Sequence, residues 1–216
     1  MNTADQSAKS KQDRRIILAS ASPRRIQLLN NLALTFEVEP ADIDETVEAG
    51  VSPQRAVQEL SAHKAAAILE KLRRQGEPGS DLDLIIIAAD TLVADGEEVL
   101  GKPQDREQAI DMLKQLAGKP HQVFTGVHII NLRNGKEEHY QECGATTVYF
   151  RKLQEEEIIS YVDSGEPMDK AGAYALQGIG AFLVEKIDGC AANVIGLPVP
   201  LVVALLRHIG VKVMGL

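Results

Sequence analysis

The chain has 216 residues, of which 44% are hydrophobic and 25% charged, and this composition excludes a disordered chain, a collagen and a coiled-coil rod. Its formal net charge of −8 and its lack of tryptophan argue against binding to nucleic acid through a basic surface or an aromatic platform. Only two cysteines, Cys143 and Cys190, are present, so a disulfide scaffold and a four-cysteine zinc site are excluded.

The N-terminal segment 1–14 is polar and charged, and it lacks the apolar stretch of a signal peptide. We expect it to be a solvated tail, because it cannot bury enough apolar surface to offset its ordering entropy. The longest nearly apolar run, 194–206, is too short to span a bilayer and carries two prolines. The sequence therefore predicts a single domain over residues 15–216 in a cytoplasmic protein that binds neither membranes nor nucleic acid.

The first half of the predicted domain alternates short apolar runs with helices that begin at Ser-Pro pairs. Ser22-Pro23 and Ser52-Pro53 each supply a helix N-cap followed by a proline at the first helical position. The run from Leu84 to Ala89 is continuously apolar, which is typical of a central strand buried on both faces. The expected elements are strands at 16–19, 35–38 and 84–89, a helix that begins at residue 23 and a helix over 53–74.

The second half contains two predicted hairpins and three predicted helices. Asp95-Gly96 and Asn134-Gly135 are strong hairpin turns, and Asp105 with Gln108 predicts a capping box. The expected elements are strands at 91–93, 99–100, 122–132, 138–150 and 182–187, helices at 105–116, 155–162 and 198–209, and an irregular glycine-rich segment at 165–180. Because the hairpins interrupt any βαβ repeat, the sequence predicts an α/β fold with a mixed, mostly buried sheet and flanking helices.

The segment from Ser20 to Arg25 runs from the end of a predicted strand into a helix N-terminus. Two hydroxyls, two guanidiniums (Arg24 and Arg25) and free backbone N–H groups converge there, which suits phosphate oxygens. A capped helix start with two solvated arginines has the same sequence pattern. Spacing alone leaves both interpretations open.

Acidic residues follow two of the predicted strands. Asp90 comes directly after six apolar residues, so we expect it to end that strand, to be partly buried and to need a partner. A carboxylate at the carboxyl end of a central strand lies where open α/β sheets bind their ligands. Asp42, Asp44 and Glu45 fall in a loop, where they form either a solvated surface or, with Asp90, a set of oxygen ligands for magnesium or manganese.

Three lysines complete the set of candidate charges. Lys64 falls on the predicted helix 53–74, Lys102 in a Gly-Lys-Pro turn and Lys170 in the glycine-rich segment. Each alone is typical of a solvated lysine, but with the two arginines they carry enough positive charge to neutralise a triphosphate. The sequence of a P-loop, the histidine spacing of a zinc site and the signature of a nucleophilic cysteine are all missing.

Seven short motifs follow one another along the chain. They are Leu18 to Arg25 (LASASPRR), Ile43-Asp44-Glu45, Ala89-Asp90-Thr91, Gly101-Lys102-Pro103, His121 to Gly126 (HQVFTG), Glu166 to Gly178 (EPMDKAGAYALQG) and Val194 to Pro198 (VIGLP). These motifs resemble those of the Maf nucleotide pyrophosphatases, in the same order and over about residues 15–209. Any one of these motifs is weak evidence for the resemblance, but seven motifs in the family's order are specific to it.

The resemblance implies two lobes around a substrate cleft, as in Maf and ITPase-like proteins, and a homodimer. It implies a hydrolase that splits a nucleoside triphosphate between its α and β phosphates, with a divalent metal such as Mg²⁺ or Mn²⁺. Asp90 is then the general base or activates water through the metal, and Glu45 is the second carboxylate on that metal. The residues implied to hold the triphosphate are Arg25, Lys64 and Lys102, with Ser20 and Lys170 as further substrate contacts.

Three positions resemble the subgroup of the family that acts on dTTP and UTP, namely Arg24, Thr91 and Gln177. The resemblance implies that these residues read the base. The amide of Gln177 offers a donor beside an acceptor, which matches the N3–H and a carbonyl of uracil or thymine and opposes cytosine. The implied role is removal of normal or modified pyrimidine nucleotides from the pool. Two alternatives stay open: a specificity for 7-methyl-GTP, and a non-catalytic role in septum formation during cell division.

Overall fold

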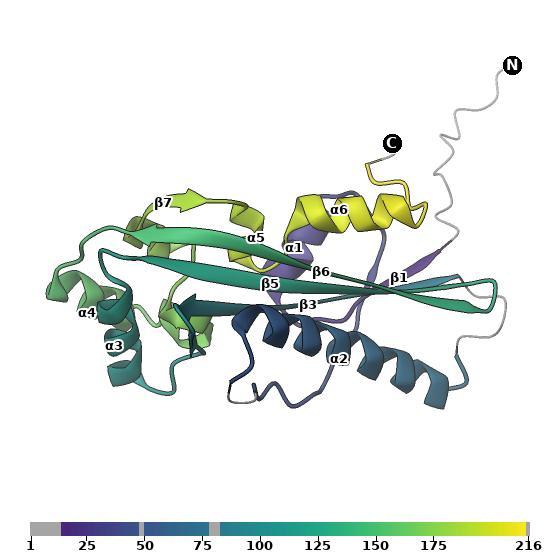
Figure 1. Cartoon of the computed structure of the whole chain (residues 1–216), viewed down its shortest axis with the longest axis horizontal. Coiled ribbons are helices and arrows are strands. Elements are labelled where there is room, and N and C mark those ends of the chain that lie inside the picture. Colours follow the sequence, from purple (N-terminus) through teal and green to yellow (C-terminus); the bar gives the residue numbers. More distant parts are fainter. Residues whose placement is uncertain (1–13, 48–49, 78–82, 215–216) are drawn as a thin grey trace, which may run out of the picture.

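The computed structural model describes residues 14–47, 50–77 and 83–214, which form one seven-stranded mixed sheet with helices on both faces (Figure 1). The strands are β1 (Arg15–Leu18), β2 (Glu37–Val38), β3 (Leu84–Asp95), β4 (Glu98–Leu100), β5 (Pro120–Arg133), β6 (Lys136–Phe150) and β7 (Val184–Asp188). Their order is β2-β1-β3-β5-β6-β7, with β4 paired to β3 off this path. β1 pairs in parallel with β2 and β3, and the other pairs are antiparallel. The predicted mixed α/β fold is confirmed.

The helices of the described residues are α1 (Pro23–Asn30), α2 (Pro53–Arg74), α3 (Arg106–Leu116), α4 (Glu155–Asp163), α5 (Ala191–Ile195) and α6 (Val199–His208). Three 3₁₀ helices, Glu166–Asp169, Ala171–Ala173 and Ile179–Leu183, lie in or next to the segment predicted to be irregular. The sequence analysis missed α5, whose five residues are too few to carry a periodic pattern. Within the described part of the chain, every helix is too short or too polar to cross a membrane.

The long strands β3, β5 and β6 extend through two lobes (Figure 1). In one lobe α2 covers one face of the sheet and α1 and α6 cover the other, so the sheet residues are buried on both sides. In the other lobe α3 and α4 pack on the sheet around Leu113, Phe150 and Tyr161. The predicted arrangement of two lobes is therefore confirmed.

Helix α2 comes into close contact with the sheet where it passes Gly126 on β5. A Cβ atom on Gly126 would lie 2.2 Å from the carbonyl oxygen of Val57, so only glycine fits this crossing. Gly126 is paired with Asp90 on the neighbouring strand β3. Lys64 lies about two turns along α2 from Val57. The crossing thus brings the buried side chain of Lys64 to Asp90.

Strand β3 differs from its prediction, because Asp90 does not end it. The strand continues to Asp95, since β5 pairs with it along its whole length. Asp90 is tolerated inside the strand because Lys64 provides the partner that its carboxylate needs. The parallel pairing with β1 stops at Leu18, so the strand whose carboxyl end faces the candidate site is β1.

Two of the predicted helix caps make other contacts than expected. Ser22 precedes α1 without a capping hydrogen bond from its side chain, whereas Ser52 accepts one from a backbone N–H of α2. Asp105 accepts from the N–H of Gln108 as predicted. The side chain of Gln108 accepts from the N–H of Gln104 instead of closing the box on Asp105, so half of the predicted capping box forms.

Arg14, assigned to the predicted tail, is held by the folded domain. Its guanidinium donates to the carbonyl of Ile209 at 2.9 Å and to the side chain of Asn131. Residues 1–13 of the predicted tail and 78–81 of the loop predicted at 75–81 lie outside the described residues.

Candidate active site

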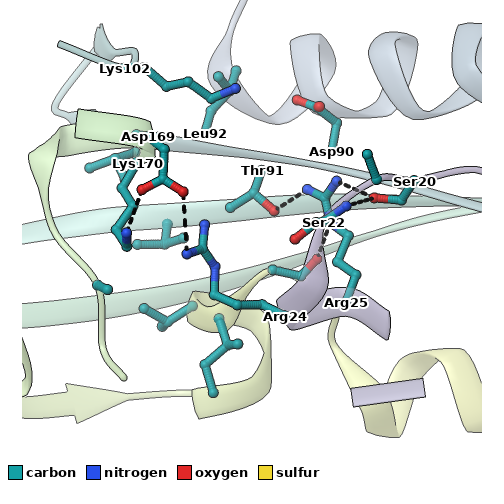
Figure 2. Close-up of a pocket in the computed structure, with 18 of the residues that line it drawn as sticks. Ser20, Ser22, Arg24, Arg25, Asp90, Thr91, Leu92, Lys102, Asp169 and Lys170 are labelled. Atoms are coloured by element: carbon teal, nitrogen blue, oxygen red, sulfur yellow. Dashed lines mark hydrogen bonds and ion pairs between the residues drawn. The ribbon is translucent and has the colours of Figure 1, made fainter. Parts of the chain in front are cut away.

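A cavity of about 540 Å³ lies where the two lobes meet. It is bounded by α1 and the segment before it, by α2 and β3 of the first lobe, and by segment 169–177 of the second (Figure 2). All ten predicted site residues line this cavity: Ser20, Arg24, Arg25, Glu45, Lys64, Asp90, Thr91, Lys102, Lys170 and Gln177. The fold thus brings together residues that are up to 157 positions apart in the sequence (from Ser20 to Gln177).

Lys64, Asp90 and Glu45 form what we call the floor of the cavity. The ammonium of Lys64 lies 2.5 Å from Oδ1 of Asp90 and 2.6 Å from Oε1 of Glu45. The side chains of Lys64 and Asp90 are 8% and 9% exposed, whereas that of Glu45 is 51% exposed. The expectation that Asp90 is buried and paired is confirmed, and Lys64 is its partner.

The cationic neighbours of Glu45 favour the ionised form of its carboxyl. Burial raises the pKa of this carboxyl, but the hydrogen bond from Lys64 and the charges of Lys102 and Arg25 outweigh that effect and hold the pKa below its ordinary value. The floor therefore carries two carboxylates against one ammonium.

Arg25 projects from α1 into the back of the cavity (Figure 2). Its guanidinium donates to the hydroxyl of Thr91 at 3.0 Å, to that of Ser20 at 3.4 Å and to the carbonyl of Gly196 at 2.8 Å. Burial lowers the pKa of Arg25, and the nearby carboxylates of the floor oppose that shift. An arginine stays protonated under such conditions, so it supplies a fixed positive charge.

The hydroxyl of Thr91 belongs to a directed chain of hydrogen bonds. Thr125 donates its proton to the carbonyl of Asn193 at 2.9 Å, so it accepts from Thr91 at 3.0 Å. Thr91 in turn accepts from Arg25. The chain ties β3, β5 and the segment around α5 to one arginine.

Arg24, Lys102 and Lys170 supply three more cations around the mouth of the cavity. The guanidinium of Arg24 lies 4.0 Å from a carboxylate oxygen of Asp169, and Lys170 donates to the same carboxylate (Figure 2). Lys170 also donates to the carbonyl of Glu166 at 2.6 Å. Since Arg24 and Asp169 come from opposite lobes, this ion pair crosses the mouth of the cavity.

The floor holds the two carboxylates of the cavity that were predicted as metal ligands. Among the residues that the structure describes, no three histidine, cysteine or acidic side chains gather as a ready metal site. The carboxylates of Glu45 and Asp90 do converge on one point, which the ammonium of Lys64 fills. One or two carboxylates are the usual protein share of a Mg²⁺ site whose other ligands are phosphate oxygens and water. The donor set therefore fits a hard cation that arrives with a triphosphate.

Sequence reasoning missed the residues that support the site from behind. Asn193 is fully buried and its amide donates to the carbonyl of Val123 and to Thr146, which fixes the segment that carries Gly196. Asp169 and the residues that hold segment 175–180 were missed as well. The only signal for them was their place in or next to the motifs at 166–178 and 194–198, where no individual role had been derived.

The comparisons with known proteins match nearly the whole chain. Residues 15–209 match the family model described as Maf, Maf-like protein. A protein of Desulforamulus reducens named dTTP/UTP pyrophosphatase is 44% identical over 200 residues, which cover 93% of this chain and 99% of the relative. A protein of Caldicellulosiruptor bescii with the same name is 41% identical over 201 residues, covering 93% and 98%.

A likeness among solved structures supports the fold. The Ham1 protein of Staphylococcus aureus superposes with a TM-score of 0.50 at 14% identity, over 90% of this chain and 99% of the other. At that identity the likeness concerns the fold alone.

Proposed function

The chain belongs to the Maf family, and we propose that it is a nucleoside triphosphate pyrophosphatase that hydrolyses dTTP and UTP to the monophosphate and pyrophosphate. The observation that carries the mechanism is the floor, where a buried lysine holds two carboxylates in the middle of a cleft lined by further cations. A triphosphate fits this cleft because its negative charge complements the cations Arg24, Lys102 and Lys170 around the mouth. The metal ion that accompanies a triphosphate complements the carboxylates of the floor. The names of the relatives and the paired carboxylates favour neither a 7-methyl-GTP specificity nor a non-catalytic role.

In this proposal Asp90 is the general base. It accepts a proton from the water that attacks the α phosphorus, while the bond from that phosphorus to the bridging oxygen breaks and pyrophosphate leaves. Lys64 orients the Asp90 carboxylate inside the strand, at a distance of 2.5 Å. A carboxylate held in this way is preorganised, so its reorientation adds little to the barrier.

The cations stabilise the charge that collects on the leaving pyrophosphate. Arg25 is fixed by three hydrogen bonds, and its guanidinium lines the same cavity as the floor residues. Lys102 and Lys170 line the mouth of the cavity from distant parts of the chain. The hydroxyl of Ser20 also lines the cavity and is proposed as a further contact to the substrate. Stabilisation of phosphoryl transfer by positioned positive charge is general in such enzymes.

Glu45 and Asp90 would hold the divalent metal, with Mg²⁺ or Mn²⁺ as the ions that two carboxylates favour. When bound, the metal neutralises phosphate charge and lowers the pKa of water near it. Glu45 is suited to this part because half of its side chain is exposed to the cavity and to solvent.

Arg24, Thr91 and Gln177 are proposed to select the base. Gln177 is exposed and lines the cavity, which supports a contact between its amide and a pyrimidine edge. The hydroxyl of Thr91 is engaged with Arg25 and Thr125, so its part in selection is to shape the wall rather than to contact the base with a free donor. A homodimer in the cytoplasm stays a prediction of the family resemblance, and light scattering on the purified chain tests the dimer.

The test is pyrophosphate release from UTP and dTTP with Mg²⁺, followed by ³¹P NMR of the products in ¹⁸O-water. We expect UMP or dTMP with pyrophosphate, and the label on the monophosphate, because water attacks the α phosphorus. Release of the diphosphate and inorganic phosphate would contradict the proposed bond cleavage. Label on the pyrophosphate would move the attack to the β phosphorus.

The matched control for the site is a pair of aspartates. Asp90→Asn removes the proposed base, whereas Asp163→Asn removes a carboxylate whose ion pair with Arg106 lies on the surface of the second lobe. The control variant is expected to keep the wild-type rate. Equal rates in both variants would exclude Asp90 as the base.

A further inference from the structure

Gln177 lies in a short segment that is fixed on both sides by polar contacts to its backbone. The segment runs from Ala175 to Gly180, and Gln177 stands near its middle with an exposed side chain at the cavity wall. The backbone on either side of Gln177 is held by two residues, Tyr161 and Glu166, that do not line the cavity.

The carboxylate of Glu166 binds the backbone on the C-terminal side of Gln177. Oε2 accepts from the N–H of Ile179 at 2.9 Å, and Oε1 accepts from the N–H of Gly180 at 2.8 Å. Burial raises the pKa of Glu166, but these two N–H groups and the hydroxyl of Tyr161 outweigh it and hold the pKa below its ordinary value. The group is therefore a carboxylate at neutral pH, with acceptors only.

The hydroxyl of Tyr161 binds the backbone on the N-terminal side of Gln177 and also contacts Glu166. Its hydroxyl accepts from the N–H of Ala175 at 3.3 Å and donates to Oε1 of Glu166 at 3.0 Å. Burial raises the pKa of Tyr161, so the hydroxyl keeps the proton that it donates. The two side chains thus form one bracket around the segment that carries Gln177.

The backbone within the bracket has a conformation that needs such support. Gly178 has φ of 86° and ψ of −151°, a region open almost only to glycine. A Cβ on Gly178 would lie 2.5 Å from Oε2 of Glu166, and one on Gly180 would lie 2.4 Å from the hydroxyl of Tyr161. The chain therefore passes close against both bracket residues directly after Gln177.

We propose that Glu166, together with Tyr161, is a positioning element for base selection, which fixes the backbone on both sides of Gln177 so that its amide meets the pyrimidine edge at one depth and angle. This inference rests on the proposed function, because it needs Gln177 to read the base. Glu166 contacts neither substrate nor metal in this scheme. Its removal loosens selection while the floor keeps its chemistry.

The test measures kcat/KM for UTP and CTP with the wild type, Glu166→Gln and Tyr161→Phe. Glu166→Gln keeps the length but supplies one acceptor oxygen where three donors converge, so at least one backbone N–H loses its partner. We expect the UTP-to-CTP ratio to fall about tenfold, with a smaller fall of kcat on UTP. Tyr161→Phe removes a single hydroxyl and is expected to lower the ratio about threefold.

A matched control and a double variant separate positioning from general support. Glu155→Gln alters another carboxylate of the same lobe, whose ion pair with Lys114 joins the start of α4 to α3. It is expected to keep the ratio. In a Gln177→Ala background, Glu166→Gln should change the ratio by less than about twofold, because its effect passes through Gln177.

A second readout does not depend on activity. Amide hydrogen exchange at Ile179 and Gly180 should be slow in the wild type and at least about tenfold faster in Glu166→Gln, since the acceptor is lost. Unchanged exchange, an unchanged ratio in Glu166→Gln, or an equal fall of the ratio with Gln177→Ala already present would each overturn the proposal. If Glu166→Gln does not fold, an unchanged ratio in Tyr161→Phe overturns it.

The wild type distinguishes this proposal from the proposed function. Pyrophosphate released equally from UTP and CTP keeps the pyrophosphatase and overturns base selection through Gln177 together with its bracket. No release from any triphosphate overturns the function itself, and the bracket with it. A UTP preference in the wild type that Glu166→Gln reduces supports both.

Discussion

The floor of the cavity and the segment 165–180 face the same volume but are built in opposite ways. Lys64 and Asp90 stand on the longest helix and on a central strand, and both are nearly buried. The segment contains short 3₁₀ helices, and beside the core packing of Ala173 and Tyr174 it is held by polar contacts from Glu166, Tyr161 and Lys170. Groups on regular elements keep their geometry when one contact is lost, whereas a loop depends on each contact.

This difference suggests a division of labour between the two regions. A reacting group needs its position within fractions of an ångström, which the packed floor supplies. A base-reading group needs to reach the ligand at a set depth, which suits an exposed side chain on a loop whose backbone is held by polar contacts. Changes at the floor should therefore remove activity, and changes in the segment should alter the choice of substrate.

Removal of the metal is the strongest test of the floor. Excess EDTA should abolish pyrophosphate release, because the two carboxylates lose the cation that neutralises phosphate charge, and added Mg²⁺ or Mn²⁺ should restore it. The measurement is initial rate on UTP with and without each ion. Full turnover in excess EDTA would mean that Lys64 and the rim cations are sufficient alone.

Asp90→Asn tests the chemistry of the floor without metal removal. We expect kcat to fall at least roughly a hundredfold, the scale of the loss of a general base. Lys64 keeps Glu45 as a partner, so the variant should fold and show a cooperative thermal transition. A wild-type rate would move the base to Glu45 and would break the distinction between the two regions.

Gly126→Ala tests whether the floor depends on the close crossing of α2. The new methyl group would meet the carbonyl of Val57, which must move, and such overpacking costs about 1–3 kcal/mol of unfolding free energy. Because the shift displaces Lys64 from Asp90, kcat should fall as well. Chemical denaturation and initial rates measure the two effects.

The control for Gly126→Ala is Gly96→Ala in the turn between β3 and β4. Gly96 has φ of 64° and open space around it, so alanine is strained there by about 1 kcal/mol without displacing any neighbour. Its unfolding free energy should fall while kcat stays unchanged. A similar loss of kcat in both variants would mean that activity follows stability and not the position of α2.

The regular parts of the molecule could be predicted from the sequence because their patterns are local. The helix 53–74 has its cap, its first proline and its apolar spacing within one segment, and its predicted bounds agree with α2. The burial of Asp90 followed from six apolar neighbours. A strand at 91–93 was predicted, but its continuity with 84–89 through Asp90 was not, because it depends on pairing with β5, which begins 25 residues after the end of β3 (Asp95 to Pro120).

The support of the site could not be predicted because it depends on contacts distant in sequence. Lys64 was singled out, but its bond to Asp90 required knowledge of the crossing at Gly126. Glu166 and Asp169 stand beside a proline and a lysine in the motif 166–178, and nothing in that pattern indicates their partners. Glu166 accepts from backbone N–H groups 13 and 14 residues later in the same lobe, and Asp169 meets Arg24 only where the two lobes join.

Gln177→Glu is the finest test, since it changes one atom type at the cavity wall. The carboxylate keeps the length of the amide but lacks the donor, so a carbonyl of uracil or thymine is left without a partner. Such a loss costs about 1–3 kcal/mol, and we expect kcat/KM on UTP and dTTP to fall about tenfold relative to CTP. CTP is affected less because its exocyclic amine donates to the new carboxylate. A panel of the four common ribonucleotides and dTTP, scored for pyrophosphate, measures this shift.

The added negative charge needs its own control, because it also repels a triphosphate. Gln75→Glu introduces the same charge at the exposed C-terminal end of α2, away from the cavity, and should leave every ratio unchanged. Repulsion at the cavity wall would lower kcat/KM for all nucleotides by one common factor, since all carry the same phosphates. Selection by Gln177 lowers the UTP-to-CTP ratio instead. A uniform fall of kcat/KM across the panel, with the UTP-to-CTP ratio unchanged, would mean that Gln177 only supports the segment. The floor and the segment would then not differ in their effect on the choice of substrate.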